Sequence, residues 1–326
     1  VEGMAEYFSL GRNDALTAMW MRDAVMRDAF PTIKQLTTDP RFFPYRYGQA
    51  LWAYIGGRWG DRAVVDVYRT ALRTGWDQAL IRSLGLSSDS LAKDWAAANK
   101  AFYRGQIEGR AHPDSVGRTI IPLEERSEYN VGPAQSADGR YVAFFTTQTN
   151  LFGIELVLAE TATGRIIRKL ASPTSDAHFD AISFINSAGD FSPDGSQFAF
   201  IVYEDGANHL SIVNTANGDI VRQFQPEGVG AIYNVAWAPD GRTIAFSGSK
   251  GGISDLYVAD VQSGAVRQLT DDRYADVQPT FSPDGRTIAF ATDRAPGTSF
   301  ERLTFGELQL ATLDVGTGEV TVHTGF

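Results

Sequence analysis

The sequence predicts a multidomain fold of the α plus all-β class, in which an N-terminal helical lobe precedes four β-propeller blades. Apolar residues recur at helical spacing from residue 1 to about 112, whereas one turn-and-strand block recurs four times beyond residue 128. The length of 326 residues also fits two domains. We place the domains at 1–112 and 128–326, joined by a linker at 113–127 where Gly, Pro, Asp and Ser replace the helical pattern.

The composition is that of a folded, acidic protein, with 43% hydrophobic residues and a formal net charge of -10. Because binding to phosphate backbones requires clustered Lys and Arg, this charge argues against nucleic acid as a partner. No apolar run is long enough to predict a membrane span. The chain has no cysteine, which excludes disulfides, thiolate nucleophiles and Cys-ligated zinc, and which fits an extracytoplasmic bacterial protein.

The helical lobe is predicted to contain four amphipathic helices. The first is capped by Asn13 or Asp14 and ends before Pro31, and the last begins at Ser87 or Ser88. A helix around 47–55 and another over 61–75 lie between them. Spacing on one face predicts these inward residues: Tyr47, Leu51, Tyr54, Ile55, Val64, Val65, Tyr68, Leu72, Leu91, Trp95 and Phe102.

The repeated element is a five-residue turn at 136–140, 192–196, 238–242 and 282–286, with the consensus Ser-Pro-Asp-Gly-Arg. Glycine adopts positive φ at no steric cost and Asp bonds to its own backbone, so the Asp of each copy is a turn former and not a catalytic carboxylate. Predicted strands follow at 141–146, 197–202, 243–248 and 287–292. A second turn follows at 163–164, 217–218, 263–264 and 317–318.

Two turns and their flanking strands make one four-stranded antiparallel sheet per repeat, which is a propeller blade. A β-sandwich with similar turns is the alternative. Because the last predicted strand reaches the end of the sequence, we expect an incomplete propeller with an exposed blade edge. The first residues lack an initiator Met and a signal-peptide pattern and read as the middle of a helix, so we also expect a chain that begins inside a larger precursor. Alternatively, segment 119–127 supplies a strand that joins the first blade to the last.

The block SPDGRTIAF at 282–290 closely resembles the PD40 repeats of TolB-like β-propellers, and the resemblance covers about 128–326. TolB propellers have six blades, so the resemblance implies that about two are missing from this chain. It also implies a protein or peptide ligand on the propeller and a periplasmic or secreted location in a bacterium.

The helical lobe has a resemblance of its own. The segment EGMAEYF at 2–8, followed by YRYGQALWAY at 45–54 and GLSSDSLAKDW at 85–95, looks like the C-terminal part of gluzincin metallopeptidases of the peptidase MA-like group. The resemblance implies that Glu2 is the third zinc ligand and that Glu6 orients a ligating histidine. It also implies that Tyr45 or Tyr47 donates a hydrogen bond to the oxyanion.

The sequence departs from that family because HExxH is absent, and the four histidines, His112, His178, His209 and His323, are isolated. Zinc is therefore expected in a full-length parent peptidase, whereas this chain alone is expected to bind none and to be inactive. Glu2 and Glu6 also fit as carboxylates near a helix start, and Tyr47 as a core residue. The alternative for the whole protein is a non-catalytic propeller interaction module with a degenerate helical domain.

Overall fold

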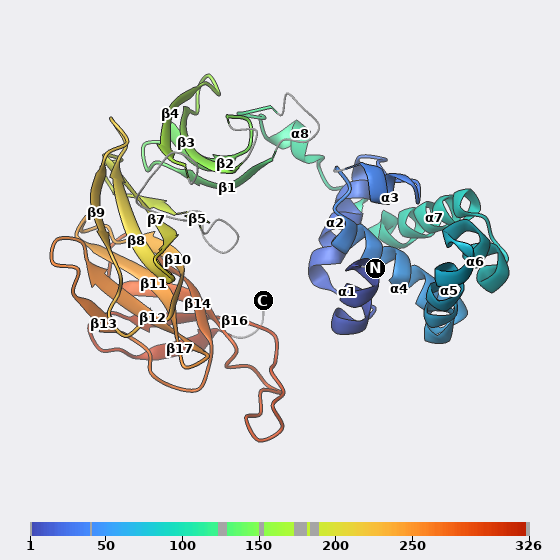
Figure 1. Ribbon diagram of the computed structural model, residues 1–326. Coiled ribbons are helices and arrows are strands. Elements are labelled where there is room, and N and C mark those ends of the chain that lie inside the picture. Colours follow the sequence, from blue (N-terminus) through green and yellow to red (C-terminus); the bar gives the residue numbers. More distant parts are fainter. Residues whose placement is uncertain are drawn as a thin grey trace. The chain divides into compact units, whose positions relative to one another are not determined.

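The computed structural model describes residues 2–39, 41–122, 129–149, 153–172, 181–182 and 189–323. The chain divides into two compact units, Val1–Thr119 and Ile120–Phe326 (Figure 1). This division falls inside the segment that the sequence analysis assigns to a linker. Among the described residues, no helix has the length and apolarity needed to cross a membrane.

The first unit is helical. Its helices are α1 (Glu2–Leu10), α2 (Ala15–Met26), α3 (Gln35–Thr38), α4 (Pro44–Trp59), α5 (Asp61–Thr74), α6 (Trp76–Leu84), α7 (Ser88–Ile107) and α8 (Pro113–Val116). The predicted caps are present, because the Asp14 side chain accepts from the backbone of Thr17 and Ser87 accepts from Ser90. Helix α6 was not predicted.

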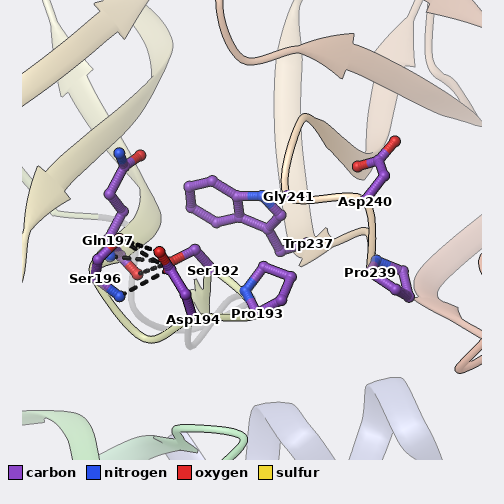
Figure 2. A pocket seen from close by; sticks show the side chains of 9 residues that line it. All are labelled: Ser192, Pro193, Asp194, Ser196, Gln197, Trp237, Pro239, Asp240 and Gly241. Carbon is purple, nitrogen blue, oxygen red and sulfur yellow. Dashed lines mark hydrogen bonds between the residues drawn. The ribbon is translucent and has the colours of Figure 1, made fainter.

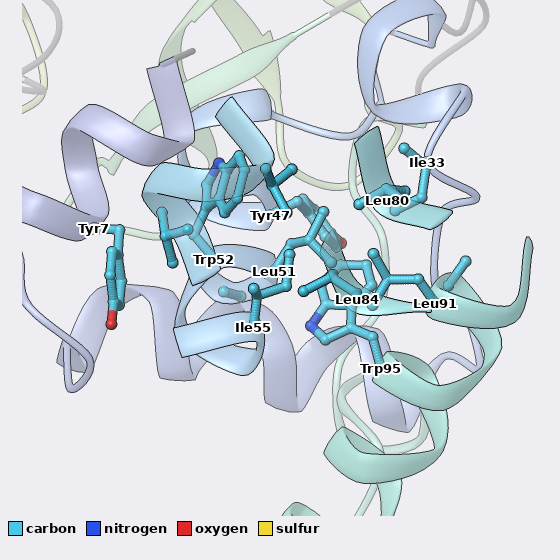
Figure 3. Packing of buried hydrophobic residues seen from close by; sticks show 14 of the residues in the cluster. Tyr7, Ile33, Tyr47, Leu51, Trp52, Ile55, Leu80, Leu84, Leu91 and Trp95 are labelled. Atoms are coloured by element: carbon cyan, nitrogen blue, oxygen red, sulfur yellow. The ribbon is translucent and has the colours of Figure 1, made fainter. Parts of the chain in front are cut away.

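One hydrophobic core joins α1 to α7 (Figure 3). Ile55, Leu91 and Trp95 are fully buried in it. Two predicted core residues are wrong, since Leu72 is 71% exposed and Phe102 is 70% exposed. In α5 the buried positions are Val64 and Val67, which are three residues apart, and in α7 Tyr103 is buried instead of Phe102. The predicted stripe is therefore correct at Val64, Leu91 and Trp95 and wrong toward the end of each of these two helices.

The second unit contains four antiparallel sheets, which we call blades 1 to 4 in chain order (Figure 1). Blade 1 has β1 (Asn130–Gln135), β2 (Tyr141–Thr146), β3 (Glu155–Glu160) and β4 (Ile166–Ala171). Blade 2 has β5 (Ala181–Ile182), β6 (Asp190–Phe191), β7 (Gln197–Glu204), β8 (Ala207–Asn214) and β9 (Ile220–Phe224). Blade 3 has β10 (Ala231–Trp237), β11 (Thr243–Lys250), β12 (Ile253–Asp260) and β13 (Val266–Gln268). Blade 4 has β14 (Asp276–Phe281), β15 (Thr287–Thr292), β16 (Gln309–Asp314) and β17 (Val320–His323).

Side chains of the strand after each repeated turn point alternately toward the preceding blade and toward the next one. In β7, Phe198 and Phe200 pack against blade 1, whereas Ala199 and Ile201 pack against blade 3. The same alternation recurs in blade 4, where the large residues of β15 pack back onto blade 3. The central Ala of the repeat therefore faces the next blade in blades 1 to 3, and the residues on either side of it face the opposite way.

In later blades one face of the sheet packs against the preceding blade. In blade 1 the corresponding face is covered by residues at the start of the second unit. Ile120 and Ile121 pack against Val142 and Phe144. A Cβ on Gly164, whose φ is +72°, would lie 2.0 Å from the carbonyl oxygen of Ile120, so this close approach requires glycine. The part of the predicted 119–127 strand that the structure describes, up to residue 122, is not a strand, and 123–128 lie outside the described residues.

Candidate binding site

The three repeated turns that open with serine, in blades 1, 2 and 4, share one hydrogen-bond pattern. In blade 2, the Ser192 hydroxyl donates to Asp194 Oδ1 at 2.6 Å, and the same oxygen accepts from the Ser196 backbone N–H at 3.0 Å. The backbone N–H of Gly195, at φ +70°, donates to the carbonyl of Ser192. In blade 1 the equivalent bonds, first that from Ser136, lower the pKa of Asp138 to about 2. The turn aspartates are thus held ionised by their own turns, as the sequence analysis expects of structural residues.

Successive turns approach each other at two of the three blade junctions. A Cβ on Gly195 would lie 3.9 Å from the Ser136 Cβ, and a Cβ on Gly285 would lie 3.7 Å from the Pro239 Cδ. Between blades 2 and 3 the corresponding position, Gly241, has no described atom within 4 Å of such a Cβ. The row of turns is therefore open at this junction.

A pocket of about 290 Å³ occupies the opening, and we call it the Trp237 pocket (Figure 2). Its lining residues are Ser192, Pro193, Asp194, Ser196, Gln197, Trp237, Pro239, Asp240 and Gly241. Figure 2 shows the indole ring of Trp237 between the blade 2 turn and the blade 3 turn.

Trp237 is fixed through its backbone. The side chain is only 6% exposed, and its backbone N–H donates to Asp190 Oδ2 of blade 2 at 2.7 Å. Burial raises the pKa of Asp190 although this bond opposes the shift. The indole Nε1 of Trp237 has no hydrogen-bond partner among the described residues.

The pocket carries negative charge. The hydrogen bond from Ser192, followed by those from Ser196, lowers the pKa of Asp194. Burial raises the pKa of Asp240, but the backbone N–H groups of Arg242 and Thr243 and the Thr243 hydroxyl outweigh it and leave that pKa lowered. Both carboxylates are thus ionised near neutral pH, and the described lining contains no Lys or Arg.

Sequence reasoning did not find this pocket, although two signals were available. Trp237 is the sole tryptophan after residue 119. Ser196 stands at the turn position that holds Arg140, Arg242 and Arg286 in the other copies. Neither signal shows that two turns from different blades leave a gap, because that depends on the packing of the sheets.

The structure places the predicted peptidase residues in α1 and α4. Glu2 is exposed in the first turn of α1, and Glu6 is paired with Arg46 of α4 at 3.3 Å. The two helices cross closely at Gly3 and Gly48, where a Cβ on Gly3 would lie 2.4 Å from the partner backbone.

The two predicted tyrosines differ in burial. Tyr45 is 41% exposed and lies 5.2 Å from the ring of Phe43, whereas Tyr47 is 6% exposed and packs edge-on against Trp20 and Phe42. Burial raises the pKa of Tyr47. Tyr47 is therefore a core residue, and an oxyanion role for either tyrosine stays a prediction.

In the described part of the chain, no three His, Cys, Asp or Glu side chains come together in a group suited to a metal ion. His178 lies outside the described residues. The described residues therefore do not form a zinc site by themselves.

Comparison with known proteins supports the assignment of the repeats. Residues 188–300 match the family model of the TolB beta propeller domain, PD40. These repeats are of the TolB-like PD40 type. The match does not extend to the helical unit.

Relatives of known name match parts of this chain. The Tol-Pal system protein TolB of Anaeromyxobacter dehalogenans is 37% identical over 94 residues, which cover 27% of this chain and 20% of that protein. The TolB homolog of Chlorobium luteolum is 29% identical over 187 residues, covering 55% of this chain and 38% of that protein. The chain thus matches well under half the length of these relatives.

Solved structures that match parts of this chain include TolB from Acinetobacter baumannii, with a TM-score of 0.49, 19% identity and coverage of 73% of this chain and 59% of that one. A putative TolB from Agrobacterium tumefaciens has a TM-score of 0.47 and 21% identity, covering 64% of this chain and 65% of that one.

Proposed function

We propose that this chain is a protein- or peptide-binding module of the TolB-like type that works outside the bacterial cytoplasm. The observation that carries the proposal is the row of repeated turns, which brings exposed residues of several blades together at one end of the sheets. Loops that cluster at one end of a rigid β scaffold are a common place for recognition. The similarity to Tol-Pal system proteins and the absence of cysteine support this function and location.

Site-specific photocrosslinking tests this function in the full chain. A photoreactive residue replaces Ala137 or Pro283 in the turns, and the matched control replaces Lys250, which is exposed at the opposite end of blade 3. With a periplasmic fraction of the source bacterium, both turn positions are expected to capture the same protein and Lys250 is not. Equal capture from all three positions, or none from the turns, would contradict the proposal.

Two finer proposals concern the parent protein. The resemblance to TolB supports an origin of the four blades in a six-bladed propeller. The resemblance of α1 and α4 to a gluzincin supports a zinc peptidase parent in which Glu2, exposed in the first turn of α1, is a zinc ligand. Two further ligands would have to come from outside the described residues.

Zinc content of the full-length parent tests the ligand role. The protein is expected to bind one zinc ion that is lost in Glu2→Ala and retained in Glu108→Ala, a change in another exposed glutamate. Unchanged zinc in Glu2→Ala, or no zinc in the unaltered protein, would favour the non-catalytic interaction module with a degenerate helical domain.

A further inference from the structure

Blade 1 shows how a guanidinium group binds to this type of turn. Arg140 donates from Nε to Asp138 Oδ2 at 2.6 Å, and its guanidinium lies 5.3 Å from the centre of the Tyr141 ring. A charged hydrogen bond and a cation–π contact thus hold one arginine on one turn.

Blade 2 lacks this arginine and the ring beneath it. Ser196 and Gln197 stand at the positions of Arg140 and Tyr141, and both line the Trp237 pocket. Asp194 accepts from the Ser196 hydroxyl, which adds no positive charge. No ion pair to Asp194 is found among the described residues.

Blade 3 supplies the missing aromatic ring. Trp237 stands between the two turns, and Asp240 adds a second carboxylate at the pocket. The Arg242 side chain lies in the electrostatic field of Asp240, although it does not line the pocket. Asp194 is therefore the carboxylate without a cation of its own.

We propose that the Trp237 pocket binds the guanidinium group of an arginine side chain from a protein partner, beside Asp194 and the indole ring. This inference rests on the proposed binding function and specifies the chemistry of the ligand. The planar guanidinium donates to a carboxylate in a fork and stacks on aromatic rings, whereas a lysine ammonium does not offer the same plane. The pocket volume of about 290 Å³ lies at the lower limit of small-molecule pockets and is large enough for one arginine side chain.

The test is a titration of the full chain with N-acetyl-arginine methylamide, followed by the ¹H–¹⁵N resonance of the Trp237 indole. Trp237→Phe identifies that resonance by its loss. The arginine probe is expected to give a saturable shift, and the citrulline analogue, which has the same shape without the charge, is expected to bind at least tenfold more weakly. Absence of a shift, or equal shifts with both probes, overturns the proposal.

Two variants locate the binding. Ser196→Arg restores the residue of the other turns, so its own guanidinium is expected to fill the pocket and abolish the probe-induced shift. Asp194→Asn keeps an acceptor oxygen for the turn but removes the charge, and is expected to weaken binding at least threefold. Asp138→Asn in blade 1 is the matched control, with binding unchanged. Undiminished probe binding in Ser196→Arg overturns the proposal even if Asp194→Asn fails to fold.

The outcome is separable from that of the crosslinking experiment. Crosslinks at the turns without a shift by the arginine probe overturn the guanidinium site and leave the binding module intact. A specific shift without crosslinks supports the site and contradicts the module.

Discussion

The serine that opens most of the repeated turns contributes to stability through its hydroxyl. Ser192 is 5% exposed, and its Oγ donates to Asp194 and accepts from the backbone N–H of Gln197 at 3.0 Å. Ser192→Ala leaves that partly buried N–H without this partner. We expect the free energy of unfolding of the second unit to fall by about 1–2 kcal/mol, measured by urea denaturation.

Blade 3 provides the matched control, because Ala238 stands at this position in the natural sequence. There Thr243 donates its backbone N–H to Asp240 Oδ1 at 2.9 Å instead. Ala238→Ser is therefore expected not to lower stability. A loss equal to that of Ser192→Ala would show that the position tolerates no change, whatever its hydrogen bonds.

A second residue, Asp255, makes stability depend on pH. It is 4% exposed, and burial raises its pKa to about 6, with further repulsion from Asp276 and Asp272. Because the pKa of this carboxyl in the unfolded chain is about 3.9, the folded protein binds the proton more tightly than the unfolded chain does. The resulting stabilisation is complete below about pH 4 and is lost as the pH rises through about 6.

Asp255→Asn removes this titration. Between pH 4 and 7 the free energy of unfolding of this variant is expected to decline less than that of the unaltered protein, by about 2 kcal/mol. Urea denaturation at several pH values measures the difference. The control is Asp284→Asn, since its Ser282 hydrogen bond lowers the pKa of Asp284 and gives the opposite sign, with stability lost on acidification. Parallel pH profiles for Asp255→Asn and the unaltered chain would refute the assignment.

At the scale of elements, the strands after the repeated turns were predictable because the turn fixes where each begins. β2 and β15 have the predicted bounds, and β7 and β11 extend by two residues. The buried positions of the helices were predicted less well. Leu72 and Phe102 are exposed, because which side of a helix is buried depends on the helices that pack against it. The Trp237 pocket depends likewise on the distance between separate blades, which no local pattern encodes.

Packing between blades predicts that the same substitution, Ala to Leu at one repeat position, destabilises blade 3 more than blade 4. Ala245 of β11 is fully buried and packs with Ile288 and Phe290 of blade 4. Ala289, at the equivalent position of β15, is half-buried. Ala245→Leu overfills a closed interface and is expected to cost about 1–3 kcal/mol, whereas Ala289→Leu is expected to change stability by less than about 0.5 kcal/mol. Urea denaturation compares them, and equal costs would contradict the directional packing of the repeat.

At the scale of the whole molecule, each unit has hydrophobic clusters of its own, so we expect a core change in one unit to leave the other folded. Leu91 is fully buried in the helical core, and Leu91→Ala is expected to destabilise that unit by about 2–5 kcal/mol.

Helical circular dichroism reports the unfolding of this unit, while the Trp237 indole resonance reports the unfolding of the second unit. The helical transition should move to lower urea with the indole transition unchanged, and Leu72→Ala, at an exposed site, should move neither. A joint shift of both transitions in Leu91→Ala would show that the two units unfold as one cooperative structure.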